Sequence, residues 1–288
     1  MTSIYKIPGY ILLLSGAFFL SWGGLLIREW EGNDIWQILF WRSFFFTNTL
    51  ILFLYLIYRK EALSILKKSG FPGVIGGIAM AVGFTAYIFA MRETTVANVL
   101  FIISTQTIWL ALFGYLFLKE KVSLKTFLSI VLAMIGIIVM IGGSLSTGSL
   151  VGNLVALFIP INFAFLILLI RKYSKLDLVP ALFYGGLIIM FFSFFMSETI
   201  FISKHDLVVG FLLGSFQHAF GFICIVIGAR STPAVVVGLL MLVETLLGPF
   251  WVWVFLNEIP PISVFIGGSI IILAVILKTL DRKYFKAL

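Results

Sequence analysis

The sequence predicts an all-α polytopic membrane protein with ten transmembrane helices arranged as two inverted five-helix repeats. Three observations support this prediction: a series of long apolar segments, basic connectors that alternate between two sides, and polar residues that match between the two halves. The composition agrees, because 61% of the 288 residues are hydrophobic and only 11% are charged. Soluble domains carry about 25% charged residues. We therefore expect the chain to place most of its apolar surface in lipid.

A helix needs about 20 mostly apolar residues to cross the hydrocarbon core of a bilayer. Segments of this kind follow one another along the chain, separated by short polar connectors. The predicted spans cover residues 9–28, 35–58, 71–91, 97–117, 123–142, 150–171, 180–200, 208–229, 235–256 and 261–280. Because no connector is long enough to form a core of its own, any function is expected inside the helix bundle.

The basic residues predict how the chain is threaded, since cytoplasmic connectors are enriched in Lys and Arg. With the N-terminus in the cytoplasm, most of the 20 Lys and Arg residues fall on the cytoplasmic side, and only Arg28, Arg92 and Lys204 fall outside. Arg42 lies within a span. We therefore expect a multi-pass protein of the cell inner (plasma) membrane with both termini cytoplasmic. The net charge of +8 then reflects threading, and no nucleic acid partner is expected.

The two halves of the chain match at nearly fixed offsets. An offset of 138 pairs Arg92 with Arg230 and Glu120 with Glu258, and an offset of 143 pairs residues 25–28 with residues 168–171. These offsets divide the chain into a first repeat, 1–146, and a second repeat, 147–288. Each repeat holds five spans, so the second must enter the membrane from the opposite side. Inverted repeats of this kind are typical of secondary transporters with a central substrate site, although duplicated channels also exist.

Polar side chains at mid-depth are the candidate substrate-binding residues. They come from five different spans: Asn48, Gln106, Asn162, His218 and Glu244. Glu244 is the most informative, because a charge at this depth costs about 2.5–3.5 kcal/mol on insertion scales. It would pair with a cationic or zwitterionic substrate or carry a coupling proton. Alternatively, it is protonated and serves as a packing contact. Gln106 and Glu244 are related by the offset of 138, so they would lie at equivalent depths in the two halves. Together they would line a central site from both sides.

Two tryptophans and two prolines complete the candidate set. Trp22 and Trp109 lie deeper than the other tryptophans and could line the cavity, where they would stack on a substrate or hold a cation; packing against lipid is the alternative. Pro160 and Pro249 interrupt helix hydrogen bonding, so they are candidate kinks for gating or static bends. No catalytic residues are predicted. No metal site is expected, because no His, Cys and carboxylate cluster has ligand spacing, and no cofactor is expected.

Five stretches carry a resemblance to a known family: residues 21–23, 41–42, 118–120, 230–234 and 243–258. In order and spacing they resemble the EamA-type permeases of the drug/metabolite transporter superfamily, over the whole chain. The resemblance implies a carrier with a central cavity that often exports amino acids or related metabolites without ATP. It also implies that Glu120 and Glu258 are structural residues at helix ends. Many members carry Gly just before these glutamates, where this chain has Lys119 and Asn257.

We therefore expect a secondary-active transporter that works by alternating access. It would move a small polar or zwitterionic metabolite, such as an amino acid, across the inner membrane in the export direction. Its partners would be the small-molecule substrate and the lipid bilayer. One alternative is a proton-coupled exporter of organic cations or drugs, with a proton as a further partner. An alternative of another class is a membrane-embedded enzyme or lipid-handling protein. The sequence favours no enzyme, because its aspartates are scattered through connectors and form no catalytic constellation.

Overall fold

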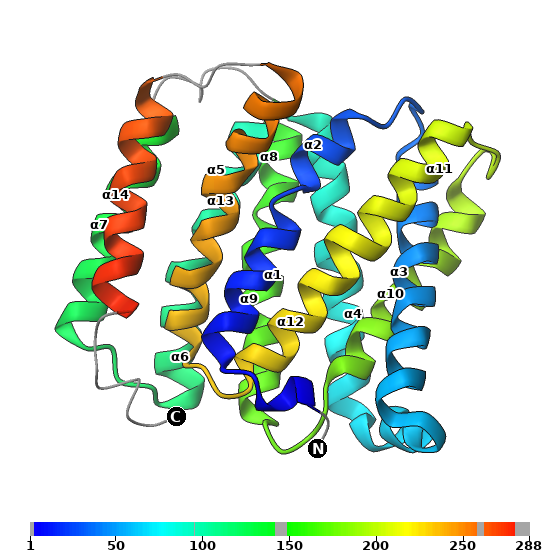
Figure 1. Cartoon of the computed structure of the whole chain (residues 1–288), viewed down its shortest axis with the longest axis horizontal. Coiled ribbons are helices and arrows are strands. Elements are labelled where there is room, and N and C mark those ends of the chain that lie inside the picture. Colours follow the sequence, from blue (N-terminus) through cyan, green and yellow to red (C-terminus); the bar gives the residue numbers. More distant parts are fainter. Residues whose placement is uncertain (1–2, 95, 142–148, 258–261, 280–288) are drawn as a thin grey trace.

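The protein is a bundle of helices that run roughly along one common direction (Figure 1). The computed structural model describes residues 3–94, 96–141, 149–257 and 262–279, and these residues contain no β-strand. The expectation of an all-helical chain is confirmed.

The α-helices of the first half begin and end close to the predicted spans. They are α1 (Gly9–Leu20), α2 (Gly23–Arg28), α3 (Ile35–Tyr58), α4 (Ala62–Glu93), α5 (Val96–Ser104), α6 (Gln106–Leu118) and α7 (Leu124–Ile141). Those of the second half are α8 (Leu150–Ala156), α9 (Phe158–Lys172), α10 (Val179–Met196), α11 (Lys204–Phe211), α12 (Phe220–Ala229), α13 (Ala234–Leu256) and α14 (Ile262–Thr279). Two short 3-10 turns, η1 (Ser3–Lys6) and η2 (Arg59–Glu61), precede α1 and α4, and a π-helix, η3 (Leu212–Ala219), joins α11 to α12.

Within the described residues, seven helical stretches are apolar and long enough to cross a membrane. They are Gly9–Arg28, Ile35–Glu93, Asn98–Leu118, Leu150–Lys172, Val179–Met196, Lys204–Ala229 and Ala234–Phe255, and two further apolar helices, Leu124–Val139 and Ile262–Leu277, are shorter. This number is lower than the ten predicted spans. One stretch, Ile35–Glu93, holds both α3 and α4, and its 59 residues would extend about 90 Å as one straight helix. The backbone turns within it, at Arg59 (φ 49°) and Gly70 (φ 51°). The chain is a multi-pass membrane protein.

Several spans are interrupted within their length. α5 gives way to α6 at Thr105, α8 gives way to α9 at Leu157, and η3 replaces regular α-helix between α11 and α12. Pro160 lies just inside the start of α9, one turn from the break at Leu157. α13, in contrast, continues through Pro249 from end to end, so the bend expected there does not divide the helix.

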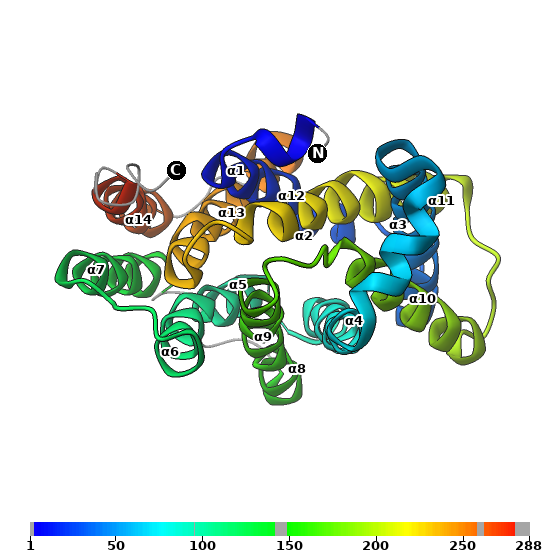
Figure 2. The same ribbon diagram turned by 90° about the horizontal axis from the view of Figure 1, so that it is seen from below.

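Figure 2 shows two layers of helices, with α14, α13, α1 and α12 in one and α7, α6, α9 and α4 in the other. Glycines allow some of these helices to approach closely. A Cβ atom on Gly214 of η3 would lie 2.3 Å from the carbonyl oxygen of Arg42 in α3. A Cβ atom on Gly185 of α10 would lie 3.0 Å from the carbonyl oxygen of Gly77 in α4. These contacts hold α3 and α4 in place around the interior of the bundle.

Candidate functional site

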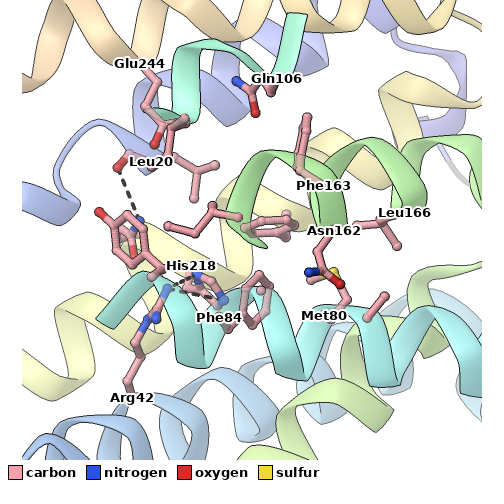
Figure 3. A pocket seen from close by; sticks show the side chains of 17 residues that line it. Leu20, Arg42, Met80, Phe84, Gln106, Asn162, Phe163, Leu166, His218 and Glu244 are labelled. Carbon is pink, nitrogen blue, oxygen red and sulfur yellow. Dashed lines mark hydrogen bonds between the residues drawn. The ribbon is translucent and has the colours of Figure 1, made fainter. Parts of the chain in front are cut away.

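A cavity lies inside the bundle, enclosed by α1, α3, α4, α5, α6, α9, η3, α12 and α13 (Figure 3). The volume open to the centres of water molecules is about 60 Å³. One water needs roughly 10–15 Å³ of such volume, so the cavity has room for about four to six waters or for one small solute. Most of the lining is apolar, and Met80, Phe163 and Leu166 form part of it.

The polar side chains of the cavity come from both halves of the chain. They are Arg42, Tyr87, Gln106, Asn162, Gln217, His218 and Glu244. Figure 3 shows Glu244 and Gln106 entering from one side and Arg42 and His218 from the other. Four of the predicted site residues, Gln106, Asn162, His218 and Glu244, therefore line one cavity.

Arg42 is fixed in the cavity wall by His218 and two aromatic rings. Its side chain is almost fully buried, with 3% of the residue exposed. Nη2 lies 2.5 Å from Nδ1 of His218, and because a guanidinium only donates, Nδ1 is the acceptor and the proton of neutral His218 is on Nε2. The guanidinium carbon also lies 5.6 Å from the ring centre of Phe84 and 5.5 Å from that of Tyr87, within the range of cation–π attraction.

Other polar atoms of the cavity wall have no partner among the described residues. Two are donors, Nε of Arg42 and Nε2 of Gln106, and one is an acceptor, Oε1 of Gln217. The Glu244 carboxylate accepts no hydrogen bond from the described residues, and it makes no ion pair with Arg42. An unpaired buried polar group costs about 1–3 kcal/mol, and a charged one costs more. The cavity thus presents free donors and free acceptors, together with the Arg42 guanidinium and the Glu244 carboxyl group, to whatever occupies it.

Irregular helix geometry places several of these side chains. Gln106 is the first residue of α6, directly after the break at Thr105, and Asn162 follows the break at Leu157 by about one turn. Gln217 and His218 belong to the π-helix η3. π-Helical turns occur frequently at functional sites, and interrupted helices form the substrate sites of many transporters.

Three of the predicted site residues do not line the cavity. Asn48 is exposed on the outer face of α3, and its side chain donates to the carbonyl oxygen of Phe44 at 2.8 Å. It follows Arg42 by six residues, a rotation of about 240° around the helix, so the two side chains point in different directions. The ring of Trp22 stacks on Trp251, with ring centres 4.2 Å apart.

Trp109, the third of these residues, packs edge-on against Phe113, with ring centres 6.2 Å apart. Sequence reasoning also missed cavity residues, of which Arg42 is the most important. A signal was present, because an arginine within an apolar span is expensive and usually functional. In the sequence, Arg42 is interpreted only as part of the charge count. Tyr87 gave no comparable signal, since tyrosine is common in apolar helices.

The connectors at the two ends of the bundle are joined by aspartates. At one end, Asp177 accepts hydrogen bonds from the hydroxyls of Tyr5 and Tyr58, and Arg230 lies 3.9 Å away. Burial, together with the Asp177 carboxylate, raises the pKa of Tyr5, so the phenol stays protonated and remains a donor at neutral pH. At the other end, Asp206 accepts from the backbone of Glu31 and Gly32.

Glu120 has a structural role at the end of α6. Its Oε1 pairs with Arg171 at 2.8 Å, and its Oε2 accepts from the backbone N–H of Ala234, the first residue of α13, at 2.9 Å. This contact agrees with the role that the family resemblance implied. Lys119, just before it, has a left-handed backbone with φ 55°, which explains why glycine suits this position. Glu258 lies outside the described residues.

The comparisons with known proteins agree with this description. The model of the EamA-like transporter family matches residues 7–142. This part of the chain, which runs from just before α1 to the end of α7, is similar to the EamA-like transporters. An uncharacterized transporter of Clostridium kluyveri is 24% identical over 305 aligned positions, which cover 96% of this chain and 94% of that protein. These two findings support the resemblance to EamA-type permeases, and they indicate that the protein is a membrane transporter.

One solved crystal structure shares the fold of this protein. Its TM-score is 0.79 at 15% sequence identity, and the alignment covers 94% of this chain and 97% of the other. The family and the clostridial relative indicate a transporter rather than an enzyme. In the part of the chain that the structure describes, no group of three His, Cys, Asp or Glu side chains could hold a metal ion.

Proposed function

We propose that this transporter is a secondary-active carrier that works by alternating access and exports a small polar or zwitterionic metabolite, such as an amino acid. The observation that carries the proposal is the cavity inside the bundle. It contains an arginine and a glutamate that have no ionic partner among the described residues. Its free donors and acceptors suit a small solute that has polar groups of both kinds. They suit a lipid chain poorly.

The proposed architecture is ten transmembrane helices in two inverted repeats, 1–146 and 147–288. The packing pattern supports it, because exchanging the two halves turns the main helix contacts into other contacts of the same bundle. α1 packs on α12 and α13, as α9 packs on α4 and α6. Likewise α3 packs on η3, as α10 packs on α4, and α7 pairs with α14.

The cavity lining repeats in the same way. Residues that line it recur at the offsets of the sequence repeat, which are 138 for most of the chain and 143 near its start. The pairs are Ala79 with Gln217, Met80 with His218, Phe84 with Phe222, Gln106 with Glu244, and Leu20 with Phe163. A site built from equivalent positions of two inverted units is the arrangement expected for alternating access.

We further propose that the protein lies in the inner membrane with both termini cytoplasmic. The cluster around Asp177 brings η1 together with the ends of α3 and α12. Basic residues gather in these same segments, including Lys6, Arg59 and Arg230. A concentration of basic residues at one end of the bundle is typical of the cytoplasmic side.

The test is a thermal-shift screen of the purified protein followed by exchange in proteoliposomes. A substrate at 100 times its dissociation constant should add about 2.7 kcal/mol to the free energy of unfolding. Vesicles loaded with an unlabelled amino acid should then accumulate the labelled one. If only lipophilic amines stabilise the protein, and if their uptake is driven by a proton gradient, the result would instead favour the organic-cation exporter. Turnover of a lipid by the purified protein would favour the enzyme.

Asn162 and Asn48 form a matched pair for testing the position of the site. Each side chain donates to the carbonyl oxygen four residues earlier on its own helix, at 2.7 Å for Asn162 and 2.8 Å for Asn48. Only Asn162 lines the cavity. Replacing Asn162 by leucine should weaken amino acid binding about five- to tenfold, since the loss of one hydrogen bond costs about 1 kcal/mol or slightly more. Leucine at position 48 should leave the affinity unchanged. Equal effects in calorimetric titrations of both variants would contradict the assignment of the cavity as the site.

A further inference from the structure

We propose that Arg42 selects the substrate by its carboxylate group and that Glu244 receives the ammonium group of the same molecule. This inference rests on the proposed function and adds the chemistry of recognition to it. The substrate class is then a small α-amino acid with a neutral side chain.

The Arg42 guanidinium has one N–H group that no described residue uses. One nitrogen, Nη2, donates to His218, and the guanidinium carbon lies 5.6 Å from the ring centre of Phe84 and 5.5 Å from that of Tyr87. Nε has no partner among the described residues. Nε therefore has an N–H that is free to donate a charge-assisted hydrogen bond to an oxygen of a ligand carboxylate. A buried arginine without an anion is costly, so a ligand carboxylate would satisfy both the charge and the unpaired donor.

On the opposite side of the cavity, hydrogen-bond acceptors lack donors among the described residues. The Glu244 residue is 8% exposed and its carboxylate receives no donor from the described residues. Gln217 contributes an unpaired acceptor, Oε1, while its Nε2 donates to the carbonyl oxygen of Leu20 at 3.2 Å. An ammonium group has three donors and no acceptor. It would therefore supply what the acceptors of Glu244 and Gln217 lack.

The pair of charges excludes simpler ligands. A phosphate or another dianion would bring negative charge into the same void as Glu244. An amine without a carboxylate would leave Arg42 unpaired beside a second cation. A zwitterion pairs with both residues and leaves the net charge of the cavity unchanged. The cavity has room for about four to six waters, and the apolar side chains of Met80, Phe163 and Leu166 offer a surface for a short apolar side chain.

The experiment compares three ligands that differ in one charged group: alanine, alaninamide, which lacks the carboxylate, and N-acetylalanine, which lacks the ammonium group. Binding to purified wild-type protein is measured by calorimetry, and exchange is measured in proteoliposomes. Alanine should bind at least about 30-fold more tightly than either analogue, because loss of one partner of a buried charge pair costs at least about 2 kcal/mol. In Arg42→Gln the preference for alanine over alaninamide should fall to about 1, whereas in Glu244→Gln the preference over N-acetylalanine should fall.

Two variants complete the design. Arg42→Lys keeps the charge without the planar guanidinium and its Nε donor, so it should retain part of the preference over alaninamide. Lys60→Gln removes one positive charge from an exposed position in η2 and should change neither ratio. If folded Arg42→Gln keeps the 30-fold preference over alaninamide, Arg42 does not read the carboxylate, and the proposed function stands.

The wild-type protein gives a test that needs no variant. Equal binding of alanine and alaninamide would overturn the inference while leaving amino acid transport intact. If wild-type protein neither binds nor exchanges any neutral amino acid, the proposed function fails, and the inference fails with it.

Discussion

Replacing Glu244 by glutamine is expected to reduce exchange of labelled alanine in proteoliposomes to less than about 3% of the wild-type rate at low substrate concentration. Glutamine has nearly the same shape, so the cavity volume is kept. The carboxylate charge, which has no donor among the described residues, is lost. Truncating one partner of a buried charged pair costs about 2–5 kcal/mol, or roughly 30-fold and more. The appropriate control is Glu198→Gln, which neutralises an exposed glutamate in the connector after α10.

The same variant separates binding from coupling. If alanine affinity is unchanged but the response of uptake to a pH gradient disappears, Glu244 carries the coupling proton and does not hold the substrate. If both affinity and driven uptake of alanine persist undiminished, Glu244 does neither, and the assignment of the cavity as the transport site is wrong.

Replacing Gly214 by alanine is expected to destabilise the fold by about 3 kcal/mol, at the upper end of the usual cost of overpacking. The added methyl group would lie 2.3 Å from the carbonyl oxygen of Arg42, 2.7 Å from Cβ of Phe45 and 2.9 Å from the backbone nitrogen of Phe46. Two of these atoms are backbone atoms of α3, so they cannot swing away. The helix would have to move as a whole, and Arg42 would move with it. Thermal unfolding in detergent, with size-exclusion chromatography, gives the measurement.

Gly248→Ala is the matched control for this variant. A Cβ atom on Gly248 would meet Cδ1 of Leu100 at 3.5 Å and the carbonyl oxygen of Ser21 at 3.9 Å, which are ordinary contacts. This variant should unfold within a few degrees of the wild type. Equal melting temperatures for both variants would show that α3 and η3 are not held as closely as the structure indicates.

The length of apolar segments was enough to predict most helices. The predicted span 35–58 coincides with α3, because a span must be continuous and apolar and little else in the sequence looks like that. The interruptions at Thr105 and Leu157 and the π-helix at Leu212–Ala219 were not predicted. An apolar segment indicates that a helix lies in lipid. It does not indicate which carbonyl each N–H group bonds to, and that choice decides between an α-helix, a π-helix and a break.

Depth in the membrane brought some of the candidate residues to the cavity but not all of them. Gln106 and Glu244 line the cavity, as their mid-depth positions suggested. Asn48 has a comparable depth, yet it faces away, because depth says nothing about which side of a helix points inward. Arg42 was overlooked because a basic residue was interpreted only as a threading signal. Tertiary packing decides both matters, through contacts such as that between Gly214 and α3.

The equivalence of Met80 with His218 and of Gln106 with Glu244 has a consequence for the history of the protein. If the proposed repeats come from the duplication of one gene, the two ancestral units were identical. The cavity between them would then have had two-fold symmetry. Such a symmetric cavity would bind an asymmetric molecule equally well in two opposite orientations. In that case, divergence after duplication placed a histidine and a glutamate in only one of the two units, and the proposed substrate would bind in a single orientation.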